Sequence, residues 1–206
     1  MTLGFFQNSD RCYGCKTCSI ACSTHHQLTP GNLLRRVRIA RPQEGIGEAY
    51  LSMACNHCDD PACMSNCPVR AYAKDPETGL VYQDHSRCIG CQTCVEVCPF
   101  HAPCYNPDDA TTYKCDGCID RYRAGLKPVC VNSCPSLNIC LETLEHIGQE
   151  HPEGLSLKEI ASQDKFASSL PTLPNYTVQL DKDWSQDIFL NIDGSELVFD
   201  RGGERY

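Results

Sequence analysis

Cysteines recur in groups of four along this chain, at spacings that suit the binding of metal. The chain has 206 residues, of which 18 are cysteines, and all but two of these fall into four quartets. Sulfurs at such spacings bind zinc or iron–sulfur clusters, or they form disulfides in small secreted chains. The quartets are Cys12-x2-Cys15-x2-Cys18-x3-Cys22, Cys55-x2-Cys58-x4-Cys63-x3-Cys67, Cys88-x2-Cys91-x2-Cys94-x3-Cys98 and Cys115-x2-Cys118-x11-Cys130-x3-Cys134.

The third quartet, CIGCQTCVEVCP, carries the most specific pattern. The run C-x2-C-x2-C-x3-C-P is typical of bacterial two-cluster ferredoxins, in which the fourth cysteine binds the neighbouring cluster. Because a [4Fe–4S] cluster takes one thiolate per iron, four complete quartets predict four such clusters. Structural zinc is an alternative, but it does not explain the third close cysteine or the terminal C-x3-C-P. A disulfide scaffold and mixed metal sites are weaker alternatives still.

Histidine is not needed to complete any quartet. His57 lies within C-N-H-C and His101 follows Pro99-Phe100, so we expect both beside the clusters or at the surface. Cys104 and Cys140 lie outside the quartets and are expected to be free thiols that fill small gaps. Two further histidines are expected at the surface, His25 and His26.

Basic residues crowd the quartets. They would offset the negative charge of bound clusters and raise their reduction potentials, or they would be ordinary solvated charges. A separate run, Arg35, Arg36 and Arg38, is interpreted as a docking surface. The residues near the quartets are Arg11, Lys16, Arg87, Lys114, Arg121, Arg123 and Lys127.

Short helical turns are expected to carry the last two cysteines of each quartet. A spacing of four residues places both sulfurs on one face of such a turn. Proline follows the last cysteine in three quartets and ends the turn, because it lacks an N–H. Ser23 stands at that position in the first quartet, where we expect a changed turn without loss of a ligand. The preceding loops hold Gly14, Gly90 and Gly117, which permit unusual backbone angles.

Strands are predicted between and after the quartets. The segment AYAKDPETGLVYQD predicts a β-hairpin, with Ala71–Lys74 and Leu80–Asp84 on either side of a turn. Arg35–Ala40 and Tyr50–Ala54 are predicted strands as well. Beyond Cys140 we interpret the sequence as a tail that drapes over the core or a partner. Its predicted elements are a helix at Leu155–Ala161 and strands at Thr177–Leu180 and Glu196–Asp200.

Composition and charge narrow the class of protein. Apolar residues make up 41% of the sequence and aromatic residues only 8%. This composition predicts a small hydrophobic core that needs further stabilisation, for example by bound metal. A net charge of −8 argues against a nucleic-acid binder. The start, MTLGFFQNSD, lacks the features of a signal peptide, and no apolar stretch is long enough for a transmembrane helix. We therefore expect folding in a reducing cytoplasm, where thiols hold metal.

Four segments together resemble a known family: GFFQNSDRCYGCKTCSIAC, CNHCDDPACMSNCP, RCIGCQTCVEVCPFHAP and KCDGCIDRYRAGLKPVCVNSCP. They are similar to the iron–sulfur electron-transfer (beta) subunit of the dimethyl sulfoxide reductase family of molybdopterin oxidoreductases, over residues 4–140. The resemblance implies an α+β fold with two ferredoxin-like 2[4Fe-4S] domains, one inserted in the other. The outer domain would comprise 1–45 plus 103–140, the inner one 46–102, and the C-terminal extension 141–206.

The resemblance also implies which cysteines share a cluster. In some relatives, such as nitrate reductases, tryptophan replaces the cysteine that matches Cys91 and that cluster has three irons, whereas cysteine here implies four irons. The implied sites are site 1 (Cys12, Cys15, Cys18, Cys134), site 2 (Cys22, Cys115, Cys118, Cys130), site 3 (Cys55, Cys58, Cys63, Cys98) and site 4 (Cys67, Cys88, Cys91, Cys94).

Members of this family relay electrons and catalyse no reaction themselves. The resemblance implies a peripheral subunit of a cell-membrane complex, with the side of the membrane left open. Its partners would be an integral membrane quinol-oxidising subunit near site 4 and a molybdopterin catalytic subunit near site 1. The anaerobic reduction of dimethyl sulfoxide or another S- or N-oxide is the expected role. The alternatives are the beta subunit of a formate dehydrogenase-like or hydrogenase complex, and a structural zinc module.

Overall fold

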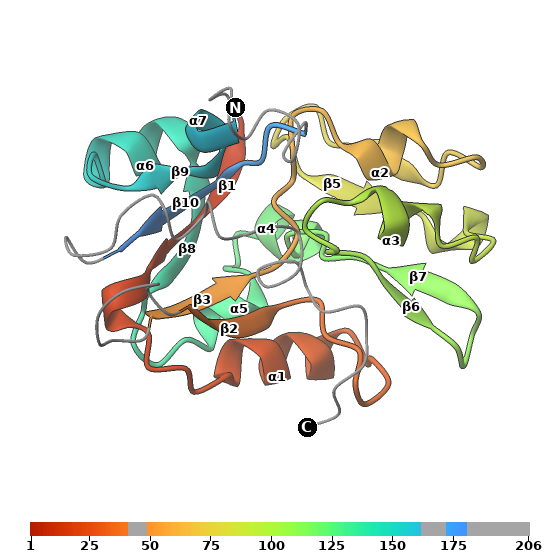
Figure 1. Ribbon diagram of the computed structural model, residues 1–206, viewed down its shortest axis with the longest axis horizontal. Helices are drawn as coiled ribbons and strands as arrows, with labels where there is room; N and C mark the ends of the chain where they lie inside the picture. The colour runs from red at the N-terminus through yellow and green to blue at the C-terminus, as the bar shows by residue number, and fades with distance from the viewer. Residues whose placement is uncertain (41–48, 162–171, 181–206) are drawn as a thin grey trace.

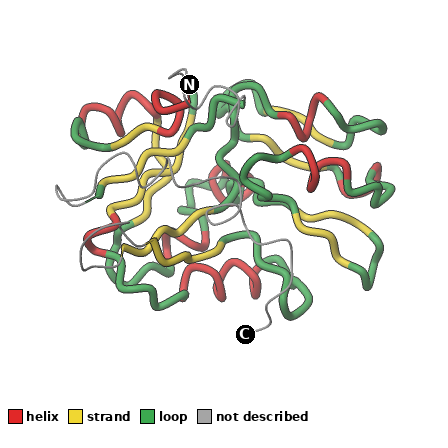
Figure 2. Tube along the Cα trace, in the orientation of Figure 1, coloured by secondary structure: helices red, strands yellow, loops and turns green. Residues whose placement is uncertain are grey.

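The protein combines short helices with small sheets. The computed structural model describes residues 1–40, 49–161 and 172–180 (Figures 1 and 2). Within these residues there are one four-stranded sheet and three two-stranded sheets. Residues from the middle of the chain, drawn yellow to green, lie on one side of Figure 1, and strands from both ends of the described chain lie on the other. No helix of this part of the chain is long and apolar enough to cross a membrane.

The four-stranded sheet joins the start of the chain to its C-terminal extension. β1 (Leu3–Asn8) pairs antiparallel with β8 (Ile139–Thr143) and parallel with β10 (Tyr176–Gln179). β9 (Leu155–Ser156) completes the order β8-β1-β10-β9. Phe5 lies opposite both Leu141 and Tyr176, and all three are buried, which places the apolar core on this sheet.

The described part of the extension is thus built into the core and does not only cover it. The predicted strand at Thr177–Leu180 is confirmed as β10. The predicted helix is confirmed as α7 (Leu157–Ala161), which begins two residues later than expected because Leu155 and Ser156 form β9. α6 (Leu144–Glu150) directly follows β8. The predicted strand at Glu196–Asp200 lies outside the described residues.

Three antiparallel strand pairs make up the remaining sheets. The predicted hairpin is confirmed as β4 with β5, which pair antiparallel. The predicted strands Arg35–Ala40 and Tyr50–Ala54 are confirmed as β2 and β3, and the structure adds that they pair antiparallel with each other. The third pair, β6 with β7, was not predicted, although the turn segment Pro107–Asp109 between its strands is a recognisable signal. The strands are β2 (Arg36–Ala40), β3 (Ala49–Met53), β4 (Tyr72–Lys74), β5 (Val81–Gln83), β6 (Cys104–Asn106) and β7 (Thr111–Tyr113).

The residue that follows the last cysteine of each quartet decides where the quartet's helix ends. Where proline follows the last cysteine, the helix ends before that cysteine, because proline disfavours helical geometry in the residue before it. The expectation that a helical turn carries the last two cysteines is therefore confirmed for the first quartet and wrong for the other three. Ser23 imposes no such limit, so α1 continues past Cys22 to His25. α4 (Ile119–Arg123) lies inside the long fourth quartet. The quartet helices are α1 (Thr17–His25), α2 (Ala62–Ser65), α3 (Thr93–Val97) and α5 (Val129–Asn132).

The C-x2-C loops turn on a residue with left-handed backbone geometry. The predicted unusual angles are confirmed: φ is +71° at Gly14, +65° at Gly90 and +72° at Gly117. The second quartet has His57 at the same position, with φ of +44°. At Gly90 there is also no room for a side chain, since a Cβ atom would lie 2.0 Å from the carbonyl oxygen of Ala110.

Gly90→Ala should therefore be far more damaging than an alanine at a roomy glycine with the same backbone angle. Gly125 is the matched control, because its φ is +73° and nothing lies within 4 Å of its Cβ position. We expect about 1–2 kcal/mol of destabilisation from the backbone alone in Gly125→Ala, and a larger loss with reduced iron content in Gly90→Ala. Anaerobic thermal unfolding and iron analysis measure both; equal losses in the two variants would contradict the argument.

Candidate metal centres

Four cysteines from two different quartets line one cavity beside α2 and α3. Cys67 ends the second quartet, whereas Cys88, Cys91 and Cys94 begin the third. Thr112 of β7 lies at the same cavity, with its Oγ1 3.5 Å from the sulfurs of Cys88 and Cys94. The structure thus brings together the members of the predicted site 4, and it mixes the quartets as a crossover requires.

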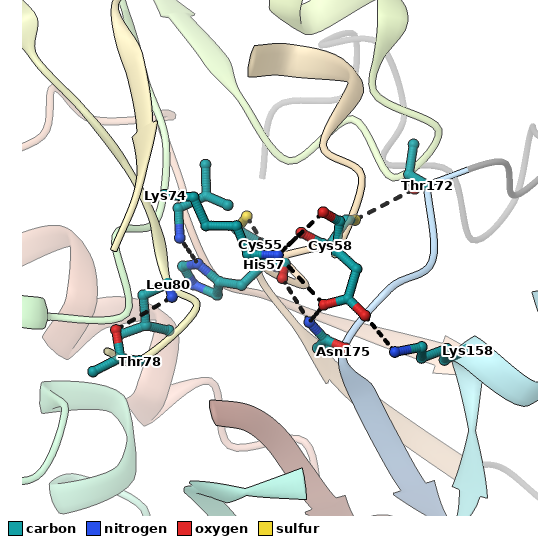
Figure 3. A network of polar contacts seen from close by, with 11 residues as sticks. Cys55, His57, Cys58, Lys74, Thr78, Leu80, Lys158, Thr172 and Asn175 are labelled. Carbon is teal, nitrogen blue, oxygen red and sulfur yellow. Dashed lines mark hydrogen bonds and ion pairs between the residues drawn. The ribbon is translucent and has the colours of Figure 1, made fainter. Parts of the chain in front are cut away.

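A second cavity has the complementary composition. It is lined by Cys55, Cys58 and Cys63 of the second quartet and by Cys98, the last cysteine of the third. A hydrogen bond of 3.3 Å joins the Cys58 sulfur to Oγ1 of Thr172 (Figure 3). These four cysteines are the predicted site 3. Apart from Lys114 and a few neutral polar groups, the wall of this cavity is apolar.

The C-terminal extension orders the loop that carries two of these cysteines. Asn175 donates from Nδ2 to the carbonyl oxygen of His57 and to Oδ1 of Asp59, each over 2.9 Å. Lys158 of α7 forms an ion pair with Asp59, and Figure 3 shows Lys158, Asn175 and Thr172 approaching the loop from the same side. Sequence reasoning missed this contact, because Asn175 is far away in the sequence and lies in no motif.

Cysteines of the first and fourth quartets also come together. Burial raises the pKa of Cys12, and the neighbouring Cys18 and Cys134 raise it further. Asn138 contacts this group, with its Oδ1 3.2 Å from the sulfur of Cys134. Cys15 is exposed and hydrogen-bonded to Thr17, which lowers its pKa. Cys12, Cys18 and Cys134 of the predicted site 1 are therefore neighbours, with Cys15 at the surface.

The predicted site 2 is more deeply buried. Burial raises the pKa of Cys22 to about 12, with Cys130 and Cys118 adding to the effect. Cys115 is buried next to Cys22, and its pKa is raised well above the ordinary value by burial and by that neighbour. The structure thus gathers one cysteine of the first quartet with three of the fourth.

The spacing of the sulfurs fits clusters better than single ions. Four sulfurs around one zinc ion, at about 2.3 Å from it, would lie about 3.8 Å apart. Among the described residues, which include all four quartets, the only group of three or more such side chains with ligand atoms all within 4.8 Å of one another is His25, His26 and Cys118. The cysteine quartets therefore surround a space, as the four corners of a [4Fe–4S] cube require.

The raised pKa values of the buried cysteines mean that metal must displace protons when it binds. Burial raises the pKa of Cys63 to about 12 and that of Cys98 to about 11. Without metal, these thiols keep their protons at neutral pH. Bound metal must replace the protons, so loading releases protons and couples to folding. All-sulfur donor sets in such an environment fit iron–sulfur clusters.

The prediction that Arg35 belongs to a docking surface is wrong, because this residue is only 1% exposed. Its Nη1 donates to the carbonyl oxygen of Ser52 over 2.7 Å, and its guanidinium lies 4.6 Å from the ring centroid of Phe5. Burial opposes its charge, but Cys130, Cys115 and Cys18 raise its pKa above the ordinary value. Arg35 is therefore a buried cation between sites 1 and 2.

Among the basic residues near the quartets, Lys114 is the buried one, with 5% exposure. Burial opposes its charge, but the neighbouring Cys55, Cys63 and Cys115 raise its pKa. His57 is 1% exposed, and burial together with the charge of Lys114 holds its pKa well below the ordinary value. Of the two histidines expected at the surface, His25 is exposed as predicted, whereas His26 is half-buried beside Asp116.

The two cysteines outside the quartets lie in strands. Cys104 in β6 is buried in the main core, which agrees with a gap-filling role. Cys140 in β8 is half-buried and pairs across the sheet with Phe6. Neither lines the cavities of sites 3 and 4.

These cavities and the ferredoxin-like cysteine loops define an iron–sulfur protein with a mixed α/β fold. The model of the 4Fe-4S dicluster domain family matches residues 47–143. The B subunit of the anaerobic dimethyl sulfoxide reductase of Escherichia coli K12 is 40% identical over 158 residues, covering 72% of this chain and 77% of that protein. The corresponding subunit of Haemophilus influenzae is 34% identical over 193 residues, covering 88% and 94%.

A third relative, the thiosulfate reductase electron transfer subunit PhsB of Salmonella typhi, is 38% identical over 168 residues, covering 79% of this chain and 86% of that protein. This protein therefore belongs to the family of iron–sulfur subunits represented by the B subunit of anaerobic dimethyl sulfoxide reductase.

The crossover between quartets predicts which cluster is damaged when one cysteine is lost. Cys67→Ser should perturb the cluster at Cys88, Cys91 and Cys94, because Cys67 lines their cavity. The cluster of its neighbours in sequence should keep its signal. Electron paramagnetic resonance of the reduced protein measures both. Cys104→Ala is the control and should retain all the iron; damage confined to the Cys55, Cys58 and Cys63 cluster in Cys67→Ser would refute the pairing.

Proposed function

We propose that this protein is a non-catalytic electron-transfer subunit with four [4Fe–4S] clusters, bound at sites 1 to 4. It relays electrons from a membrane quinol-oxidising subunit to a molybdopterin catalytic subunit, which reduces dimethyl sulfoxide or another S- or N-oxide. The fold proposed with it is two ferredoxin-like domains, the inner one (46–102) inserted into the outer one (1–45 plus 103–140), with 141–206 as the extension.

One observation carries this proposal: the cysteines are exposed at two ends and covered between them. Cys15 of site 1 and Cys91 of site 4 are exposed, whereas every cysteine of sites 2 and 3 is buried or half-buried. A relay needs this arrangement, because electrons must enter and leave at the surface and be shielded on the way. Exposed apolar residues stand beside both end sites and suit contact with other subunits, namely Tyr13, Leu137 and Ile89.

Contacts between the sites support the order 1-2-3-4. Arg35 lies between Cys18 of site 1 and Cys130 of site 2. Lys114 joins sites 2 and 3, and Cys63 of site 3 has Cys94 of site 4 as a neighbour. A bound cluster supplies a one-electron couple with little change in geometry. The protein's own residues set the spacing, exclude water and fix the charges around each step.

The polarity of the relay is proposed by analogy with the family. We propose that site 4 faces the membrane subunit and that site 1 faces the catalytic subunit. The names of the relatives support this class of complex, since they belong to dimethyl sulfoxide and thiosulfate reductases. The protein would then act as a peripheral member of a membrane complex.

Metal analysis tests the cluster content directly. Protein purified without oxygen should be brown and contain about sixteen iron and about sixteen acid-labile sulfide per chain, since each of the four clusters holds four of each. Air oxidation followed by chelation should remove iron and sulfide together, because the protein holds the sulfide only as part of the clusters. A colourless preparation, or one that contains about four zinc ions, would refute the proposal.

Co-purification and turnover test the partners. A tagged full-length chain should bring down a molybdenum-containing subunit and an integral membrane subunit from anaerobically grown cells. A reduced quinol analogue should drive the reduction of dimethyl sulfoxide by that complex, and Cys91→Ser should lower the rate without loss of the catalytic subunit. Turnover only with thiosulfate, or formate oxidation instead, would assign the protein to another complex of the same class.

A further inference from the structure

Two buried residues cross between sites 2 and 3 in opposite directions. His57 lies between Cys55 and Cys58 in the second quartet, yet its Nε2 lies 4.0 Å from the sulfur of Cys115 in the fourth. Lys114 directly precedes Cys115, yet its Nζ donates to the sulfur of Cys55 over 3.4 Å. Each residue therefore belongs to the loop of one site and contacts a cysteine of the other.

The backbone of one strand residue holds both side chains in place. The N–H of Val81 in β5 donates to Nδ1 of His57 over 3.0 Å, and the carbonyl oxygen of Val81 accepts from Nζ of Lys114 over 2.5 Å. Because Nδ1 accepts a hydrogen bond, the ring proton lies on Nε2 and faces Cys115. Lys114 also donates to the carbonyl oxygen of Cys115 over 2.5 Å, so all three of its protons are used.

His57 has left-handed backbone geometry at a position where the other three quartets have glycine. The equivalent position in the other three quartets is Gly14, Gly90 or Gly117, and each has a positive φ. His57 adopts a φ of +44° as well, although a bulky side chain makes such an angle unfavourable. A strained residue persists where the surroundings hold it, and it points to a functional role for the side chain.

We propose that Lys114 and His57 form a reciprocal bridge that raises the electron affinity of sites 2 and 3 together, at the middle of the relay. This inference rests on the proposed four-cluster function. An added electron makes a site more negative, and a fixed ammonium group with an N–H donor at the sulfur stabilises that charge. In each transfer the electron lost at one site is the electron gained at the other, and no bond or proton changes place.

Lys114→Met tests the bridge by removing its charge at nearly constant volume. In the full-length chain purified without oxygen, redox titration followed by electron paramagnetic resonance should show lower potentials for two of the four couples. Each should lose at least tenfold in its reduction equilibrium constant, which is 59 mV for a one-electron couple. Lys114→Arg should retain most of the potential. Lys127→Met is the matched control, since Lys127 is exposed and the same charge is lost, and it should shift neither couple.

His57→Asn tests the other arm without a change of charge. Asparagine tolerates a positive φ, and its Oδ1 can accept from Val81, but nothing then reaches Cys115. The potential of site 2 should fall while that of site 3 changes much less. Cys115→Ser and Cys55→Ser assign the two signals.

Each outcome separates this inference from the proposed function. If the wild-type chain holds about sixteen iron but neither variant shifts a potential, the bridge is refuted and the relay stands. If Lys114→Met shifts only one couple, the bridge is not reciprocal and the proposal fails. If Lys114→Met and His57→Asn both lose their clusters while Lys114→Arg retains them, the role is structural and the proposal also fails. A wild-type chain without iron would refute the function and the bridge together.

Discussion

Burial of negative charge is the constraint on which this structure depends. Thiolates and the clusters they hold add charge to a chain that is already acidic, at −8 before any thiol ionises. Backbone N–H groups that donate to sulfur offset part of this charge. Those of Ala71, Ala102 and Gly117 lie 3.3–3.4 Å from cysteine sulfurs. Two buried cations offset more of it: Arg35 lies near cysteines of sites 1 and 2, and Lys114 near cysteines of sites 2 and 3. Hydrogen bonds to charged groups are stronger than neutral ones, so both devices stabilise the loaded state.

The same constraint explains why the helices that carry the cysteines are so short. Most quartet helices are about one turn long, and helices of that length are not stable in isolation. Cysteines themselves form part of the buried core, among them Cys18, Cys22, Cys115 and Cys130. Bound metal therefore replaces much of the apolar packing that a domain of this size would otherwise need, and folding couples to metal loading. The exception is the β8-β1-β10-β9 sheet, which has an ordinary apolar interior.

Sequence reasoning succeeded where a local rule decides the structure. Proline after the last cysteine ends the short helices, glycine permits the left-handed loops, and Asp75–Gly79 turns the β4–β5 hairpin. It failed where distant segments meet. The burial of Arg35 depends on Ser52 and Phe5. The hydrogen bonds that Asn175 donates to His57 and Asp59 depend on the parallel pairing between β10 and β1. No local pattern encodes such contacts, because they are fixed only when separate strands align. The unusual histidine in C-N-H-C was visible in the sequence, but its partner Cys115 was not.

His57 also shows that the four quartets are not interchangeable repeats. If each loop only had to hold a metal, glycine would serve best at this position, since it adopts a positive φ without strain. The second quartet carries a strained histidine instead, and the fourth carries a buried lysine at the facing position. Sites 1 and 4 have an exposed cysteine each, so water can screen an added charge there, whereas sites 2 and 3 are covered. A covered site penalises an added electron unless fixed groups stabilise it. His57, which breaks the repeat, and the buried Lys114 therefore lie between the proposed sites 2 and 3, where solvent cannot stabilise an added charge.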